Sequence, residues 1–167
     1  MRTASFVVAL AALGVAGCAE GVGPGGPGAA RRSLAIVEWQ GPGQPSDPHA
    51  GKPGYTPGEW TSEPITAPQS VQAGAEFSVI VRTVGPNGCW RAGDTPVEYA
   101  AGEVRITPYD VHSGAQACTE LLGYLPHPVK LRLDTPGEVV LRVQGRRVVN
   151  GTVQDDPTVI THRIVVR

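Results

Sequence analysis

The sequence of 167 residues contains few aromatic residues and no excess of charge of either sign. Phe, Trp and Tyr make up 5% of the chain, and 14 Lys and Arg face 15 Asp and Glu, for a net charge of −1. Binding to nucleic acid or to an anionic membrane surface needs a surplus of positive charge, so both classes are excluded. The chain holds 22 Gly and 16 Pro, about twice the usual share of roughly 12%, which disfavours a helical protein.

The sequence motifs of common hydrolases and metalloproteases are also absent. There is no Gly-x-Ser-x-Gly elbow and no His-Glu-x-x-His helix. Asp110, His112 and Ser113 lie within four residues, but groups so close along a chain rarely converge as a triad, and we interpret Asp110, Ser113 and Gly114 as turn residues. The prediction is a non-enzymatic protein without a cofactor. An unrecognised hydrolase is the remaining alternative, and convergence of Asp110, His112 and a Ser in a pocket would indicate it.

The N-terminal segment has the three regions of an export signal. Met1-Arg2-Thr3 is followed by an apolar run, Ala4–Val15, which is shorter than the roughly 20 residues needed to span a bilayer. Val15-Ala16-Gly17-Cys18 resembles the bacterial lipobox, with Val15 in place of the commoner Leu. The resemblance implies cleavage before Cys18 and lipid on that cysteine. The alternatives are ordinary secretion with cleavage nearby, or neither fate.

The resemblance also implies a place for the mature protein. It would be anchored to the cell envelope by acyl chains on Cys18, and each buried CH₂ contributes about 0.8 kcal/mol. Residue 19, directly after the lipidated position, is Ala rather than the Asp of inner-membrane lipoproteins. In a Gram-negative host, outer-membrane sorting is therefore favoured.

Composition divides the rest of the chain into a tether and one domain. Residues 18–33 are rich in Gly and Pro and have too little apolar surface to offset the entropy of ordering. Residues 34–167 are predicted to form a β-domain, interrupted by a long Gly/Pro-rich loop at 40–64. Leu34–Trp39 is predicted to be a first strand, isolated in sequence, that pairs with a distant segment.

From Ile65 onward the apolar pattern has period two, which predicts strands. Strands 97–99 and 104–106 are predicted to form one hairpin. Asn150-Gly151 predicts a second, because both residues accept the positive φ angles of a type I′ turn. Val129–Leu133 and Val139–Val143 are predicted to be neighbours joined by a turn at Thr135-Pro136-Gly137. Seven or eight such strands predict a single antiparallel β-sandwich.

Residues 64–84 resemble the opening of bacterial Ig-like sandwich modules. The resemblance depends on Ala67-Pro68, Val71 and Gly74, followed by the alternation of Phe77, Val79 and Val81. It implies an Ig-like sandwich without the Cys-Trp-Cys spacing of antibody domains. The remainder of the domain resembles no characterised family.

Three cysteines minus a lipidated Cys18 leave one pair, Cys89 and Cys118, 29 residues apart. Export to an oxidising compartment predicts a disulfide between them. Closing this loop would contribute roughly 3.5 kcal/mol by the chain-entropy model. Free thiols and a metal or redox pair are the alternatives, although the sequence contains no C-x-x-C spacing.

The four histidines, His49, His112, His127 and His162, are too far apart in sequence to indicate a metal site, so none is predicted. His112, His127 and His162 are the weak candidates. We interpret His162 as a half-buried residue that hydrogen-bonds to a neighbour, because it shares a strand face with Ile160 and Ile164. Asp155-Asp156 is interpreted as a solvated turn, with a weak Ca²⁺ site as the alternative.

Aromatic residues in polar segments are the candidates for partner binding. These candidates are Trp60, Tyr55 and Trp90. The alternative is a purely structural role, in which Trp90 packs on the disulfide and Trp39 lies in the core. Several arginines fall near outward strand positions, where they either protect edge strands or hold an anionic glycan or phosphate: Arg105, Arg132, Arg142, Arg146 and Arg147.

The sequence therefore predicts a lipid-anchored envelope accessory protein that binds a protein or glycan partner through a β-sandwich. The alternative is a periplasmic protein that binds a metal or small ligand through His112, His127 or His162.

Overall fold

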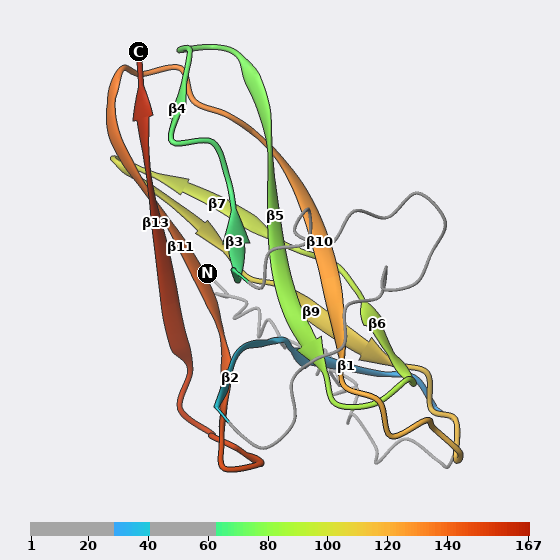
Figure 1. Ribbon diagram of the computed structural model, residues 1–167. Coiled ribbons are helices and arrows are strands. Elements are labelled where there is room, and N and C mark those ends of the chain that lie inside the picture. The colour runs from blue at the N-terminus through green and yellow to red at the C-terminus, as the bar shows by residue number, and fades with distance from the viewer. Residues whose placement is uncertain (1–28, 41–62) are drawn as a thin grey trace, which may run out of the picture.

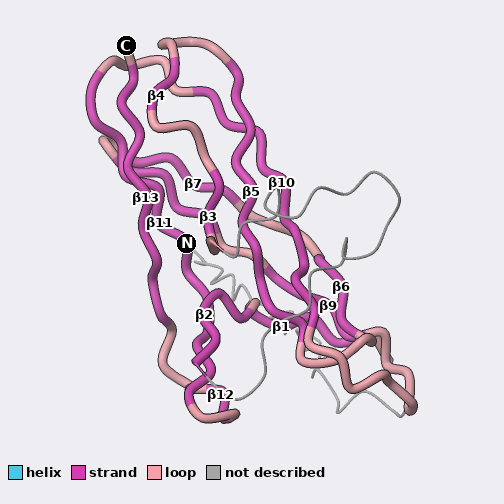
Figure 2. Tube along the Cα trace, in the orientation of Figure 1, coloured by secondary structure: helices cyan, strands magenta, loops and turns pink. Residues whose placement is uncertain are grey.

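Figure 1 presents the computed structural model of the chain, which describes residues 29–40 and 63–167. Within these ranges the protein is all-β: the tube in Figure 2 shows strands joined by loops and turns. No helix that could cross a membrane is present in the described part of the chain. Residues 1–28 and 41–62, which include Cys18, His49, Tyr55 and Trp60, lie outside it.

The described part contains more strands than the seven or eight expected, because the expected first strand is divided at Ala35 and several further strands have only two to four residues. Three strands have only two residues, namely β3 (Ile65–Thr66), β4 (Ser70–Val71) and β12 (Thr152–Val153). The longest are β5 (Glu76–Gly85), β10 (Gly123–Arg132), β11 (Gly137–Val149) and β13 (Thr158–Val166). The others are β1 (Arg31–Leu34), β2 (Ile36–Gln40), β6 (Trp90–Ala92), β7 (Val97–Ala100), β8 (Glu103–Ile106) and β9 (Tyr109–His112).

The strands form three open sheets in a sandwich-like arrangement. One sheet has the order β10-β5-β3, a second β1-β9-β6, and the largest β4-β13-β11-β8-β7, with β2 and β12 also pairing with β11. The expectation of a purely antiparallel sandwich was wrong, because β11 pairs in parallel with both β2 and β8, and β13 pairs in parallel with β4. A period of two shows which side chains face inward, but not the direction of the neighbouring strand.

The prediction that Val129–Leu133 and Val139–Val143 pair was also wrong. The first segment covers the end of β10 and the residue that follows it, and β10 pairs with β5 from Gly123 to Arg132. The second lies in β11, which pairs with β13 and β8. The turn at Thr135–Gly137 therefore carries the chain from one sheet to the other, as the arch between β10 and β11 shows in Figure 1.

Two predicted hairpins are confirmed. β7 and β8 pair antiparallel, with Val97 opposite Ile106 and Ala100 opposite Glu103. β11 and β12 pair around Asn150 and Gly151, whose φ angles of 51° and 80° are those of a type I′ turn.

The first strand also pairs with distant segments, as expected, but it differs from the prediction in two ways. It divides at Ala35 into β1, which pairs with β9, and β2, which pairs with β11. It also starts at Arg31, so Arg31, Arg32 and Ser33 belong to a strand rather than to the tether. The predicted loop at 40–64 lies outside the described residues except at its ends.

A single main core fills the space between the sheets. Val79, Val81, Val129 and Leu131 project from β5 and β10, and they meet residues such as Leu141 from the largest sheet. A smaller cluster, Ile36, Val84 and Val148, lies beside Trp39, Leu122 and Tyr124. Burial of these Val, Leu and Ile side chains, at about 1.5–3 kcal/mol each, is the main stabilising contribution.

The first prediction concerns Gly145, which lies where the parallel pairing of β2 with β11 begins. A Cβ at this position would lie 2.8 Å from the carbonyl oxygen of Ala35 and closer still to the Val37 side chain. We expect Gly145→Ala to lower the free energy of unfolding by about 1–3 kcal/mol, because the backbone of β2 would have to move. Urea denaturation would measure the change.

Gly123→Ala is the matched control, since a Cβ there meets no atom within 4 Å. It should leave the free energy of unfolding within about 0.5 kcal/mol. Equal effects of the two substitutions would contradict the close approach of the Ala35–Val37 segment to Gly145.

Candidate functional site

The inward faces of β5 and β10, and the buried positions that run from β8 into β9, change from apolar to polar at the same end of the core. In β5 the buried series Val79, Val81 continues to Thr83, and in β10 the series Leu131, Val129 continues to His127. The buried positions of β8 and β9 likewise lead from Ile106 to Asp110. Thr83, His127 and Asp110 are 0%, 1% and 2% exposed, so three polar side chains close the end of the apolar core.

These side chains satisfy one another by hydrogen bonds. His127 Nε2 lies 2.9 Å from Asp110 Oδ1, and Thr83 Oγ1 lies 3.0 Å from both carboxylate oxygens. His127 Nδ1 lies 2.7 Å from Thr95 Oγ1, on the loop before β7. Burial lowers the pKa of the Arg146 guanidinium, and the negative charge of Asp110 acts in the opposite direction. Arg146 therefore lies close enough to Asp110 for their charges to interact. We name Thr83, Thr95, Asp110 and His127 the buried polar network; it links β5, β9, β10 and the β6–β7 loop.

This arrangement corrects the interpretation of Asp110 as a turn residue. Asp110 lies within β9 and is buried, whereas His112 contacts the disulfide and Ser113 Oγ accepts a hydrogen bond from the Ala115 N–H at 3.3 Å. Asp110, His112 and Ser113 share no hydrogen bond with one another in the described structure, so the arrangement that would have indicated a hydrolase is not assembled by these residues. Asp110 instead orients His127 within a closed interior.

The second prediction tests the buried polar network. Asp110→Ala would remove the carboxylate that both His127 Nε2 and the Thr83 hydroxyl contact. It would leave them only each other, at 3.2 Å, and the Leu125 carbonyl, at 3.4 Å from Thr83 Oγ1, and each poorly satisfied buried group costs about 1–3 kcal/mol. We expect a loss of about 2–5 kcal/mol in the free energy of unfolding, measured by denaturant titration.

Asp134→Ala is the control, because the ion pair of Asp134 with Arg132 at 2.9 Å is exposed. Its removal should change the free energy of unfolding by less than about 1 kcal/mol. The account of the network would be contradicted if Asp110→Ala were as mild as this control.

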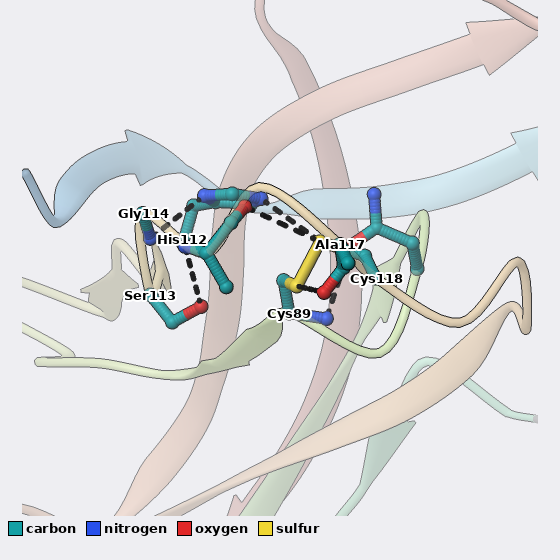
Figure 3. The surroundings of a disulfide bond; sticks show 8 residues. Cys89, His112, Ser113, Gly114, Ala117 and Cys118 are labelled. Atoms are coloured by element: carbon teal, nitrogen blue, oxygen red, sulfur yellow. Dashed lines mark hydrogen bonds between the residues drawn. A yellow bond between two sulfur atoms is a disulfide. The ribbon is translucent and has the colours of Figure 1, made fainter. Parts of the chain in front are cut away.

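The disulfide predicted between Cys89 and Cys118 is present. It joins the segment before β6 to the loop after β9, and Figure 3 shows the His112 ring beside it. His112 Nε2 lies 3.8 Å from Cys118 Sγ, while the N–H of Gly114 donates a hydrogen bond of 3.0 Å to His112 Nδ1. The rings of Trp90 and His112 are not stacked. They form an edge-to-face contact with centroids 5.2 Å apart.

Cys89, Cys118 and His112 are also the group of described residues whose ligand atoms lie close enough to hold a metal ion, all within 4.8 Å of one another. Two features oppose that role: the sulfurs are joined to each other, and His112 Nδ1 accepts a hydrogen bond. The ring proton of neutral His112 is therefore on Nε2, the nitrogen that faces the sulfur, so its lone pair is not free for a metal.

The three candidate histidines do not meet at one site. His112 lies at the disulfide, His127 belongs to the buried polar network, and His162 is half-buried on β13 beside the core. The predicted position of His162 is confirmed, but its buried Nε2 has no hydrogen-bond partner. Asp155 and Asp156 lie in an exposed bend, consistent with a solvated turn.

A surface pocket of about 450 Å³ opens next to the disulfide, lined by Arg31, Arg32, Ser33, Asn87, Trp90 and His112. Strand register explains its composition: His112 on β9 is paired with Arg31 on β1 and with Trp90 on β6. Directly paired residues project from the same face of a sheet, so a cation, an imidazole and an indole form one row. None of the described residues that line the pocket is acidic.

Some side chains of the pocket already have partners within the protein, whereas others are available to a ligand. Arg32 donates two hydrogen bonds to Asp94, at 2.8 and 2.7 Å, and its guanidinium lies 3.4 Å above the Tyr109 ring. This bonding raises the pKa of Arg32 and holds the pKa of Asp94 below its usual range. Among the ion pairs of the described part, none involves Arg31. Asn87 Oδ1 accepts the Cys89 N–H at 3.0 Å, which leaves its amide N–H groups to donate.

The other arginines named from the sequence do not gather. Arg105 and Arg142 both pair with Glu103, at 2.6 and 2.7 Å, and hydrogen bonding from Arg105 lowers the pKa of that carboxyl. Arg132 pairs with Asp134, and Arg146 donates to the Leu34 carbonyl at 2.6 Å. The Nε of Arg147 is buried without a hydrogen-bond partner. Arg105, Arg132 and Arg142 are therefore engaged in ion pairs with neighbouring carboxylates, in two different sheets.

A larger hollow, of about 590 Å³, lies between the β7–β8 hairpin and the turn after β10. Its charged residues, Glu103, Arg132 and Asp134, are already engaged in ion pairs. The pocket at Arg31 and Trp90 is for this reason the better binding candidate.

The sequence pointed to Trp90 and His112 as candidates. It did not point to Arg31 or Asn87, nor to the buried, inward-facing position of His127. The alternation of Leu133, Leu131 and Val129 already placed His127 at the next inward position, so this residue could have been found. Comparison with known proteins gives no further guidance, because no family model, curated protein or solved structure matches the chain.

Proposed function

We propose that this protein is an exported, lipid-anchored and non-enzymatic envelope accessory protein, whose Ig-like β-sandwich binds a protein or glycan partner. The observation that carries the proposal is the row of Arg31, His112 and Trp90 in a pocket whose described lining contains no acidic residue. The lipobox-like sequence at Cys18 supports the anchor, with the outer membrane favoured by Ala19 in a Gram-negative host.

Of the two partner classes, an acidic glycan fits the pocket better. Arg31 offers a guanidinium to a carboxylate or sulfate, and the half-buried Trp90 offers part of an indole ring to the apolar face of a sugar. Asn87 and Ser33 supply hydrogen-bonding groups of the kind that sugar hydroxyls use. An apolar protein segment would leave these polar groups without partners, which costs affinity.

The pocket also stands close to the proposed anchor along the chain. About 13 residues separate Cys18 from Arg31, and such a segment spans at most about 45 Å when fully extended. A lipid on Cys18 would therefore hold the pocket within about 45 Å of the membrane surface. The binding site and the anchor would act together.

The third prediction tests the anchor in the native host. Wild-type protein should appear in the membrane fraction with a mass increase on Cys18 from its acyl chains. Cys18→Ala should lose both the added mass and the membrane association, because residue 18 supplies the thiol that accepts lipid. Soluble wild-type protein with an unmodified residue 18 would contradict the anchor.

The fourth prediction tests the pocket with oligomers of polygalacturonate as a carboxylated probe and dextran as a neutral one. We expect polygalacturonate to bind and Arg31→Ala to weaken it tenfold or more, since a desolvated charge contact is worth about 1.4 kcal/mol or more. Trp90→Ala should weaken binding to a similar extent through loss of ring contact. Isothermal titration would give both affinities.

Arg163→Ala is the matched control, because Arg163 is exposed and pairs with Glu138 at 3.1 Å on a different sheet. It should leave the affinity within twofold. Equal binding of dextran, or equal weakening by Arg31→Ala and Arg163→Ala, would show that the pocket does not recognise an acidic glycan.

A further inference from the structure

The two sulfurs of the disulfide have almost the same backbone surroundings. Cys89 Sγ lies 3.6 Å from the carbonyl oxygen of Ala117, and Cys118 Sγ lies 3.7 Å from that of Ala115. A carbonyl at such a distance disfavours negative charge on either sulfur to a similar degree. The backbone carbonyls therefore do not favour one sulfur over the other as a thiolate.

His112 makes the two sulfurs different. Its Nε2 lies 3.8 Å from Cys118 Sγ, and no hydrogen bond joins it to Cys89 in the described structure. Because Nδ1 accepts the Gly114 N–H, the proton of the neutral ring is on Nε2, the nitrogen that faces Cys118 Sγ (Figure 3). A donor at this place stabilises a thiolate on Cys118.

We infer that the Cys89–Cys118 disulfide is a thiol-exchange site with a fixed direction, in which Cys89 is attacked and Cys118 leaves. An external thiolate forms a bond to Cys89 Sγ as the Cys89–Cys118 bond breaks, and the electron pair of that bond stays on Cys118 Sγ. The leaving thiolate accepts the hydrogen bond from His112 Nε2. A thiol of lower pKa leaves faster, so exchange at Cys89 is the faster of the two possible attacks.

The reaction balances without any further oxidant. The first step converts one thiolate and one disulfide into a mixed disulfide on Cys89 and a thiolate on Cys118. A second thiolate then attacks the mixed disulfide on its outer sulfur and releases Cys89, so two external thiols are oxidised and the protein disulfide gains two electrons. Both cysteines are half-buried rather than enclosed, so a small thiol can approach them.

This inference is independent of the ligand proposed for the pocket, and glutathione is its probe. Native protein is mixed with glutathione at pH 7, quenched with acid, alkylated and digested, and the mixed disulfide is located by peptide mass. We expect glutathione on Cys89 over Cys118 in an excess of about three- to tenfold, the effect of one hydrogen bond on the leaving sulfur. The same protein in guanidinium should lose this preference, because His112 is no longer held at Cys118.

The fifth prediction therefore concerns His112 variants. His112→Phe keeps an aromatic ring for the contact with Trp90 but removes the donor, and it should slow exchange and bring the two mixed disulfides to similar amounts. His112→Gln retains an N–H group that can reach the sulfur and should keep much of the preference. A mass loss of two hydrogens in each purified variant shows that the disulfide has formed.

Three results would overturn the inference. The first is glutathione found mainly on Cys118, or equally on both cysteines, in native wild-type protein. The second is an unchanged preference in His112→Phe. The third is a wild-type disulfide that exchanges only when the protein is unfolded, which would make the bond purely structural.

Discussion

The hydrogen bonds between Asp110, His127 and Thr83 are the interaction on which the position of the candidate site depends. An apolar core cannot tolerate one buried carboxylate, one imidazole and one hydroxyl unless they satisfy each other. Each comes from a different strand, so their mutual satisfaction requires β9 to stay against β5 and β10. Because β9 also pairs with β1 and β6, the buried polar network fixes the three-stranded sheet that carries the pocket.

One face of β9 connects the interior to the surface. Asp110 closes the core, and two residues later His112 lies between Arg31 and Trp90 in register. His112 has a different partner at each nitrogen, the Gly114 N–H on one side and Cys118 on the other. The His112 imidazole therefore takes part in both the proposed binding pocket and the proposed disulfide exchange. Its position depends on the buried polar network, which includes Asp110 two residues earlier in β9.

The sequence predicted the elements that depend on local information. Period-two patterns identified the strands, Asn150-Gly151 identified a hairpin, and the count of cysteines identified the pair Cys89 and Cys118. Wrong predictions concerned relations between distant segments. The pattern of Val129–Leu133 is the same whether its neighbour is β5 or β11, because alternation reports only which side is buried.

The candidate site was predictable only in part for the same reason. Trp90 stood out as an aromatic residue in a polar segment, but Arg31 was assigned to the tether since Gly and Pro precede it. Nothing in the sequence shows that Arg31 and Trp90, far apart in the chain, flank the same residue of β9. The pairing of β1 with β9 brings them together, and this pairing is a property of the folded sheet.

The central claim is that the row of Arg31, His112 and Trp90 is a binding surface. The most direct measurement is an amide chemical-shift titration of the ¹⁵N-labelled protein with polygalacturonate oligomers. The account predicts that shifts concentrate at Arg31–Ser33, Asn87–Trp90 and His112, and that they saturate. Shifts centred instead on the hollow beside Tyr99, or no saturable shifts at any residue, would contradict it.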